Sequence, residues 1–256
     1  MDNRMNALRI VVVSLVILVV ASLAPAHGQS LVDSDQSTDC AYEFGSGAFV
    51  WCVSEGGNLV RLTSPGDAEH IRVGNVAEGS VVCAADVGPY FDVNVASSGW
   101  EAPVLVEPPG DTGVSIERMT SDGRFTLLQA FTQNRADRSI TIRMTVTNNG
   151  EEIGNVRLLR SADFDMDNTR NGDVFDKSDN AAWARQTNSV TLAALNRGVD
   201  HHVRLSANLA PRNCSPNAHY GPVPSSGTDL AASIRYDLGH LAPGESRSVR
   251  VRYKVY

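Results

Sequence analysis

The chain has 256 residues, of which 42% are hydrophobic and 20% are charged, and its formal net charge is −7. A chain of this length can bury a substantial core without depending on metals or cross-links. The acidic excess argues against nucleic acids and anionic membrane surfaces as partners, because both repel a negatively charged protein.

The N-terminus has the pattern of a secretory signal peptide. Two arginines precede an apolar run from Ile10 to Leu23, and small residues follow it. The run is shorter than the roughly 20 residues that a membrane-spanning helix requires, although an uncleaved anchor is the alternative interpretation. We expect residues 1–28 to be removed, with cleavage after Ala26 or Gly28. The mature protein is then extracytoplasmic, either secreted, at the cell surface or in the periplasm, and is not inserted in a membrane.

The rest of the chain is predicted to contain a short polar start and one β-rich region. Residues 29–39 are expected to be disordered, because they are polar and terminal. Residues 40–256 contain no long stretch with helical spacing. A Pro-rich segment near 101–113 is the best candidate for a boundary, either as a linker between two modules or as a crossover within one large sandwich.

Four cysteines lie in this region: Cys40, Cys52, Cys83 and Cys214. An even number in an exported chain predicts two disulfides. Three pairings are open, and Cys40 with Cys52 is the local choice. A zinc site is the alternative, but the chain has no C-x-x-C pair to support it.

Hydrophobic alternation with a period of two predicts strands throughout this region. The clearest case is Ile140 to Val146, where apolar residues alternate with Thr and Arg as in a half-buried strand. The C-terminal segment Val249–Val255 alternates in the same way. Other strands are expected at Ala48–Ser54, Asn58–Thr63, Ser80–Ala85, Tyr90–Ala96, Val114–Arg118, Phe125–Phe131, Ile153–Leu159, Ser189–Leu195, His202–Ala207 and Leu230–Tyr236.

Short strands separated by Gly, Pro, Asn and Asp predict an all-β protein. The expected fold is an antiparallel β-sandwich, either one large two-sheet sandwich or an immunoglobulin-like one.

Several segments carry a resemblance to known exported proteins. V-T-N-N-G-E-E-I-G-N-V-R-L-L and L-A-P-G-E-S-R-S-V-R-V-R-Y-K-V resemble strands of bacterial immunoglobulin-like modules. G-N-L-V-R-L-T-S-P-G-D-A-E-H-I, E-R-M-T-S-D-G-R-F-T-L-L-Q and R-S-A-D-F-D-M-D resemble landmarks of uncharacterised exported bacterial proteins. The resemblance spans most of the mature chain. It implies a bacterial, extracytoplasmic β-protein and brings no established activity or catalytic residues.

The acidic stretch that begins at Asp163 is the best candidate for a functional site. A D-x-D-x-D-N run on a curling loop can surround a calcium ion, which takes six to eight oxygen ligands. The match to an EF-hand loop is partial. Asn168 stands at its glycine position, and Val174 replaces its closing glutamate. The predicted calcium ligands are Asp163, Asp165, Asp167, Asn168, Asn171 and Asp173.

A solvated acidic loop is the alternative to a metal site. In an extended strand, carboxylates two residues apart lie about 6.6 Å from each other, which is too far for one ion. Phe164 and Met166 would then be buried, and the aspartates would face water. The calcium hypothesis therefore requires the backbone to curl after Met166.

Two further groups of residues suggest other chemistry. Asp163 with Asp165, or either with Asp92, would form the carboxylate pair of a glycoside hydrolase. Asp200-His201-His202 would supply a base and the group that orients it, although on a strand the two histidines face opposite sides.

Aromatic side chains suggest carbohydrate binding. Trp51, Trp100, Trp183 and Tyr90 would stack on sugar rings if they were exposed on one sheet face. For Trp51, which lies in an apolar strand, we expect a place in the core instead.

These patterns together predict an exported binding or structural β-sandwich protein with a calcium-binding loop. Its expected partner is a carbohydrate or a cell-surface protein. The alternative is a carbohydrate-active enzyme, a polysaccharide hydrolase or lyase, on the same scaffold.

Overall fold

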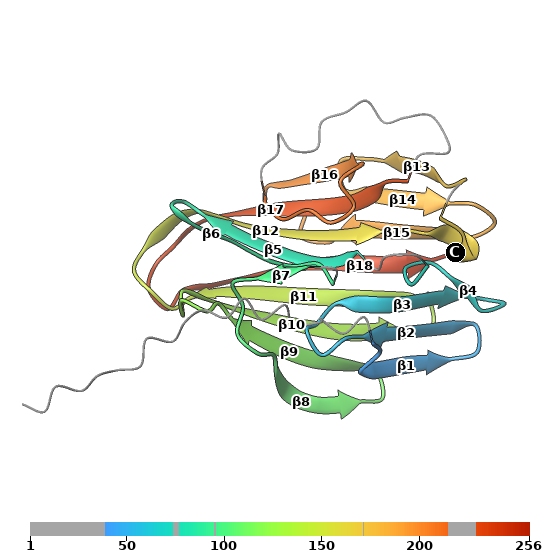
Figure 1. Ribbon diagram of the computed structural model, residues 1–256, viewed down its shortest axis with the longest axis horizontal. Coiled ribbons are helices and arrows are strands. Elements are labelled where there is room, and N and C mark those ends of the chain that lie inside the picture. The colour runs from blue at the N-terminus through green and yellow to red at the C-terminus, as the bar shows by residue number, and fades with distance from the viewer. Residues whose placement is uncertain (1–38, 74–76, 95, 171, 215–228) are drawn as a thin grey trace, which may run out of the picture. The chain divides into compact units, whose positions relative to one another are not determined.

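The computed structural model describes residues 39–73, 77–94, 96–170, 172–214 and 229–256 (Figure 1). Residues 34–256 belong to one compact unit. The predicted signal peptide and all but the last residue of the predicted disordered start lie outside the described residues. Within those residues, no helix has the length and apolar character needed to span a membrane.

The described chain is built from antiparallel strands in three sheets. The largest sheet has the order β13 (Val174–Lys177), β14 (Ala181–Arg185), β15 (Ser189–Ala194), β18 (Ser246–Val255), β11 (Ser139–Asn148), β10 (Phe125–Asn134), β9 (Gly113–Met119) and β8 (Val104–Gly110). The six-stranded sheet has the order β16 (His201–Ser206), β17 (Ala231–Leu241), β12 (Ile153–Asp163), β5 (Glu78–Ala84), β6 (Val87–Asp92) and β7 (Ser97–Ser98). The four-stranded sheet runs β1 (Tyr42–Ser46), β2 (Phe49–Val53), β3 (Leu59–Ser64) and β4 (Ala68–Glu69).

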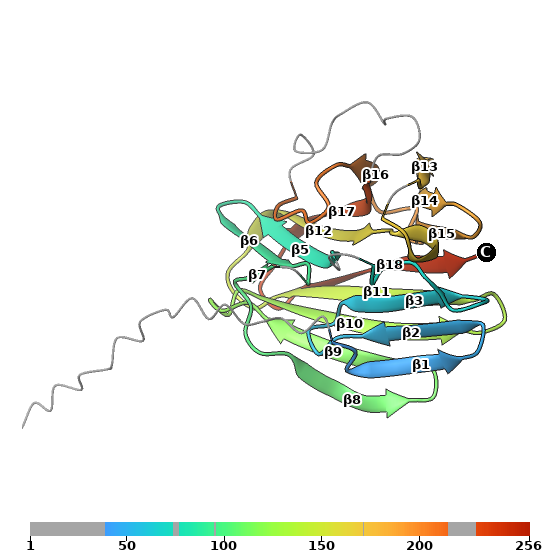
Figure 2. The same ribbon diagram turned by 45° about the vertical axis from the view of Figure 1, so that its right-hand side comes forward.

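The two smaller sheets pack on one face of the eight-stranded sheet. In both views, β1 to β3 overlie β9 and β10 (Figure 1, Figure 2). Trp51 of β2 stacks on Phe131 of β10, with ring centroids 6.3 Å apart. From the six-stranded sheet, the hydroxyl of Tyr236 donates to the carbonyl of Arg250 in β18 at 2.7 Å. The predicted all-β antiparallel sandwich is therefore confirmed, in its large multi-stranded form.

The alternation that predicted the central strands is confirmed by burial. Ile140, Ile142, Met144 and Val146 of β11 are fully buried, whereas the Thr and Arg residues between them are half-buried or exposed. One face of β11 therefore forms the core, because successive side chains of a strand point to opposite faces.

The Pro-rich segment near 101–113 lies inside the sandwich and contributes to its large sheet. Residues 104–110 form β8 at the sheet edge, and β9 follows directly and pairs with it through two register shifts. Two prolines are tolerated here because one side of an edge strand needs no ladder hydrogen bonds. The sequence left a linker and a crossover within one sandwich as alternatives here, because the same prolines are typical of both.

Two disulfides link distant parts of the chain. Cys40 is bonded to Cys52, and Cys83 of β5 is bonded to Cys214, which lies 131 residues away. The local pairing is therefore confirmed, and no cysteine is free.

A buried ion pair joins the layers. The guanidinium of Arg160 in β12 donates to both carboxylate oxygens of Glu78 in β5, at 2.5 and 2.7 Å, and to Gln129 of β10 at 2.6 Å. The hydroxyl of Tyr253 in β18 donates to the same glutamate at 2.6 Å. The side chains of Arg160 and Glu78 have no exposed surface. Burial raises the pKa of Glu78, and the charge of Arg160 opposes that shift.

Replacing one partner of this pair should be strongly destabilising. Arg160→Ala leaves Glu78 buried without its counter-charge, and we expect a loss of roughly 3–5 kcal/mol in the free energy of unfolding. Chemical denaturation at neutral pH measures it. Arg143→Ala, on the exposed face of β11, is the matched control and should change stability by less than about 0.5 kcal/mol. Equal losses in the two variants would contradict the role given to the buried pair.

Candidate metal centre

The acidic stretch leaves the sheet in a tight curl. Strand β12 ends at Asp163, and a single 3₁₀ turn, η1 (Met166–Asn168), follows. Asp167 and Asn168 both have left-handed backbone conformations, with φ of 55° and 64°. Asparagine and aspartate tolerate this region better than other non-glycine residues. Asn168, which stands at the glycine position of an EF-hand loop, therefore adopts a conformation that a glycine there would also permit.

The loop that follows β4 holds this curl through its backbone. The amide of Asp163 donates to the carbonyl of Ala77 at 2.9 Å, and the amide of Asp165 donates to the carbonyl of His70 at 3.1 Å. The amide of Asp167 donates to Nδ1 of His70 at 3.3 Å. Burial lowers the pKa of His70 to about 4, so the imidazole is neutral and its Nδ1 can accept this bond. The curl is therefore part of the folded core.

Three carboxylates meet at the start of the curl. Oxygen atoms of Asp163, Asp165 and Asp229 all lie within 4.8 Å of one another. Asp163 and Asp165 are 3% and 2% exposed. Asp229 comes from the residues just before β17, where Ala231 pairs with Asp163 of β12. The pairing of β12 with β17 therefore brings a carboxylate from a distant part of the chain to this point.

Asp173 is the fourth carboxylate of the group. It is 2% exposed, and its Oδ2 accepts a hydrogen bond from the amide of Met166 at 3.4 Å. Its negative charge contributes to the raised pKa values of Asp163 and Asp165. We call Asp163, Asp165, Asp173 and Asp229 the acidic cluster.

The acidic cluster has unused hydrogen-bonding capacity. Within the described part of the chain, the buried Oδ1 atom of each of the four carboxylates accepts no hydrogen bond, and none of the four forms an ion pair within 4.0 Å. Buried polar atoms in native proteins are normally paired with protein, water or an ion. The four unpaired oxygens of the acidic cluster can therefore accept either protons or a cation.

The titration of the acidic cluster reflects burial and crowding. Burial, together with the charge of Asp229, raises the pKa of Asp163 to about 9. Burial and the charges of Asp229 and Asp173 raise the pKa of Asp165 to about 7. Burial raises the pKa of Asp173 to about 6, against the opposing effect of hydrogen bonds from Met166 and Gln186. Without a cation, the acidic cluster therefore retains protons near neutral pH.

The other predicted ligands have different partners or are not described. The carboxylate of Asp167 accepts hydrogen bonds from the amides of Thr187 and Asn188 and from the Asn188 side chain. Burial raises its pKa, but these bonds outweigh that effect and lower the pKa overall. The side-chain oxygen of Asn168 accepts from the amide of Glu69 at 3.1 Å. Asn171 lies outside the described residues.

The burial of Phe164 and Met166 was expected for a flat acidic strand. Both side chains are fully buried, but Asp163 and Asp165 between them are buried as well. The solvated-loop alternative is therefore wrong for these two aspartates, because the curl turns their carboxylates inward instead of leaving them on a wet strand face.

The carboxylate pairs suggested for hydrolysis do not face solvent. Asp163 and Asp165 are too deeply buried to reach a polymer. Asp92 is 4% exposed, and its carboxylate is bonded by Asn58 and Arg118.

The aromatic residues do not form one exposed platform. Trp51 is fully buried, as expected. Trp100 packs edge-on against Tyr90 at 6.1 Å, and the guanidinium carbon of Arg118 lies 5.7 Å from its ring centroid. Tyr90 is 6% exposed, whereas Trp183 of β14 is half-buried.

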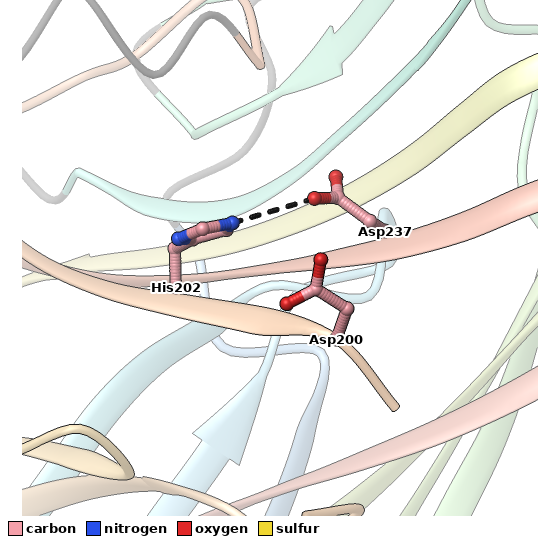
Figure 3. Close-up of side chains that lie close together, drawn as sticks. All are labelled: Asp200, His202 and Asp237. Atoms are coloured by element: carbon pink, nitrogen blue, oxygen red, sulfur yellow. Dashed lines mark ion pairs between the residues drawn. The ribbon is translucent and has the colours of Figure 1, made fainter. Parts of the chain in front are cut away.

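The two histidines of Asp200-His201-His202 have different environments. Both ring nitrogens of His201 are bonded, to the carbonyl of Val199 at 2.8 Å and to Asn180 at 3.1 Å. His202 lies beside Asp200 and Asp237, and ligand atoms of these three side chains lie within 4.8 Å of one another (Figure 3).

The raised pKa values predict that the metal-free protein loses stability at alkaline pH. A carboxyl group with a higher pKa in the folded state stabilises the fold at low pH, and this contribution is lost as pH rises through the folded pKa. Between about pH 7 and pH 9, Asp163 and Asp165 should lose protons, while His70 is neutral in both states. Denaturation in chelator should give a lower free energy of unfolding at pH 9 than at pH 7. Asp163→Asn should remove most of this slope, and an unchanged slope in that variant would contradict the assignment.

Comparisons with known proteins show a fold and no family. No family model and no curated protein sequence matches the chain. Among solved structures, a bacterial glucoamylase complexed with acarbose matches with a TM-score of 0.57 and 9% identity over 86% of this chain, which spans only 32% of the glucoamylase chain. A putative aldose 1-epimerase from Escherichia coli K12 has a TM-score of 0.49 and 13% identity, covering 84% of this chain and 98% of its own. A galactose mutarotase-like protein from Lactobacillus casei has a TM-score of 0.46 and 10% identity. The match covers 84% of this chain and 99% of the mutarotase-like protein. At these identities the first likeness supports the β-sandwich fold alone, and the other two are too distant to carry an argument.

Proposed function

We propose that this protein is an exported binding or structural β-sandwich protein whose acidic cluster holds a calcium ion. One observation carries the proposal: four carboxylates, three of them on buried residues, form the acidic cluster, and each has one buried oxygen without a hydrogen-bond partner in the described chain. Two unit charges of the same sign about 4 Å apart repel by ~4 kcal/mol at an effective dielectric of 20. A divalent cation turns this repulsion into attraction and occupies the unpaired oxygens at the same time.

The chemistry of the acidic cluster favours calcium among divalent ions. All four side chains offer carboxylate oxygen, which hard cations prefer, and none offers the sulfur that zinc and copper sites often use. Calcium binds oxygen at 2.3–2.6 Å, so oxygens on opposite sides of one ion lie about 4.8 Å apart. The spread of the Asp163, Asp165 and Asp229 oxygens fits that limit. Four carboxylates, some of them bidentate, can supply the six to eight ligands that calcium takes.

The covalent chemistry supports an extracytoplasmic location. Two disulfides indicate an oxidising compartment, which agrees with the signal sequence predicted at the N-terminus. This location supports the resemblance to exported bacterial β-rich proteins with immunoglobulin-like strand patterns. Extracellular fluids also contain enough calcium for modules of modest affinity. The partner of the protein is a carbohydrate or a cell-surface protein.

Calcium should stabilise the fold in proportion to its affinity. A ligand that binds only the folded state adds about 2.7 kcal/mol at a concentration one hundred times its dissociation constant. We expect calcium to raise the melting temperature of the mature protein by several degrees above the value in chelator. Thermal melts followed by circular dichroism at pH 8 measure this shift. Identical melting curves in calcium and in chelator would rule out the calcium site.

Charge removal separates an ion site from a purely structural cluster. Asp165→Asn should abolish the shift caused by calcium and should raise the melting temperature in chelator, because one repelling charge is gone. Asp176→Asn is the matched control, since this exposed aspartate in the same acidic stretch lies outside the acidic cluster. A variant that melts lower in chelator and still responds to calcium would contradict the proposal.

A further inference from the structure

The outer face of the six-stranded sheet carries a polar group that the calcium site does not use. Tyr236 of β17 points to the eight-stranded sheet, so its neighbours Arg235 and Asp237 lie on the opposite face. His202 of β16 is the direct cross-strand partner of Arg235. Asp200, just before β16, lies beside them and is exposed (Figure 3). We call Asp200, His202, Arg235 and Asp237 the outer-face cluster.

Asp237 is held in place by two arginines. Nη2 of Arg235 donates to its Oδ2 at 2.8 Å, and Nε of Arg157 in β12 lies 3.4 Å from its Oδ1. Arg235 is 6% exposed, and its Nε and Nη1 atoms donate no hydrogen bond to any residue that the structure describes. Two unused donors on a guanidinium this buried are unusual. They indicate that a polar ligand completes this group.

His202 has hydrogen-bonding capacity that its neighbour His201 lacks. Its Nε2 lies 3.4 Å from Oδ2 of Asp237, beyond the usual range for a hydrogen bond, and its side chain is 38% exposed. The exposed carboxylate of Asp200 has no side-chain partner within the described chain. Donors and acceptors therefore lie next to one another where solvent can reach them.

The balance of charge selects the kind of ligand. Arg157 on the neighbouring strand adds a second positive charge to that of Arg235. With it, the outer-face cluster has two negative and two positive charges and is neutral overall when His202 is neutral. The arginines disfavour a metal cation, and the aspartates disfavour a phosphate or another anion. A neutral ligand with adjacent hydroxyl groups suits both the carboxylates and the arginines. Each hydroxyl can donate a hydrogen bond to a carboxylate and accept one from a guanidinium or an imidazole.

We propose that the outer-face cluster binds the vicinal hydroxyl groups of a neutral sugar residue. The carboxylates of Asp237 and Asp200 accept from the two hydroxyls, and the ring of His202 and the guanidinium of Arg157 donate to them. Nη2 of Arg235 holds Asp237, and its unused Nη1 donates to the nearer hydroxyl. This site is separate from the acidic cluster, and it gives the protein a carbohydrate partner independently of any metal.

The test uses the mature chain, with and without added calcium, and follows the histidine Cε1–H resonances by NMR. D-Glucose and D-galactose are the probes, and tetrahydropyran-2-methanol, a similar ring without vicinal hydroxyls, is the control compound. We expect a saturable shift of the His202 resonance with at least one sugar and none with the control compound. We expect Asp237→Asn to weaken this binding at least tenfold. His240→Gln should bind as the unchanged protein does, because this exposed histidine lies farther along β17.

Three results would overturn the proposal. The first is the absence of a saturable shift with both sugars. The second is an equal response to tetrahydropyran-2-methanol, which would indicate nonspecific contact. The third is a shift with zinc chloride alone and none with sugar, which would assign the outer-face cluster to a metal. Circular dichroism of Asp237→Asn confirms that the variant is folded, and Arg157→Gln, on the neighbouring strand, should weaken binding if Asp237→Asn fails to fold.

Discussion

Repulsion among buried carboxylates is the constraint on which the functional interpretation of this protein depends. Asp163, Asp165, Asp173 and Asp229 are brought together by the fold, and no described residue bonds their buried Oδ1 atoms. A chain can accommodate such a group only by protonating it or by binding a cation. The raised pKa values describe the first state, and the proposed calcium ion provides the second. Under the proposal, binding of the ion therefore releases protons from the acidic cluster.

The sheet that contributes to the acidic cluster is also stabilised by the buried ion pair between Arg160 and Glu78. Arg160 and Glu78 lie on β12 and β5, so a fully neutralised ion pair lies a few residues before the unneutralised carboxylates of the same strand. The contrast is informative, because the described chain supplies a counter-charge and several hydrogen bonds for Glu78, whereas Asp163 forms no ion pair and its Oδ1 accepts no hydrogen bond. The protein thus neutralises Glu78 with its own residues, whereas we propose that a bound cation neutralises the acidic cluster. The outer face of the same sheet shows a third arrangement, in which arginines and aspartates balance but keep free donors and acceptors.

Much of the fold could be predicted from the sequence, because local alternation reports burial. The buried face of β11 and the local disulfide both follow from residues close together in the chain. The edge strand β8 was missed because its prolines are typical of linkers. The acidic cluster was predicted only in part. No local sequence pattern marks Asp229, because it reaches Asp163 only through the pairing of β12 with β17. Asp167 fits the ligand pattern in the sequence, but its carboxylate accepts hydrogen bonds from the amides of Thr187 and Asn188 instead.

The central claim is tested most directly by calorimetric titration of calcium into chelator-treated protein at pH 8. We expect each chain to bind one calcium ion. Binding should release protons, because the acidic cluster holds protons in the metal-free state. We also expect Asp229→Asn, a residue that only the fold brings to this place, to remove the binding. A titration without binding heat in several buffers, or full binding by Asp229→Asn, would contradict the account.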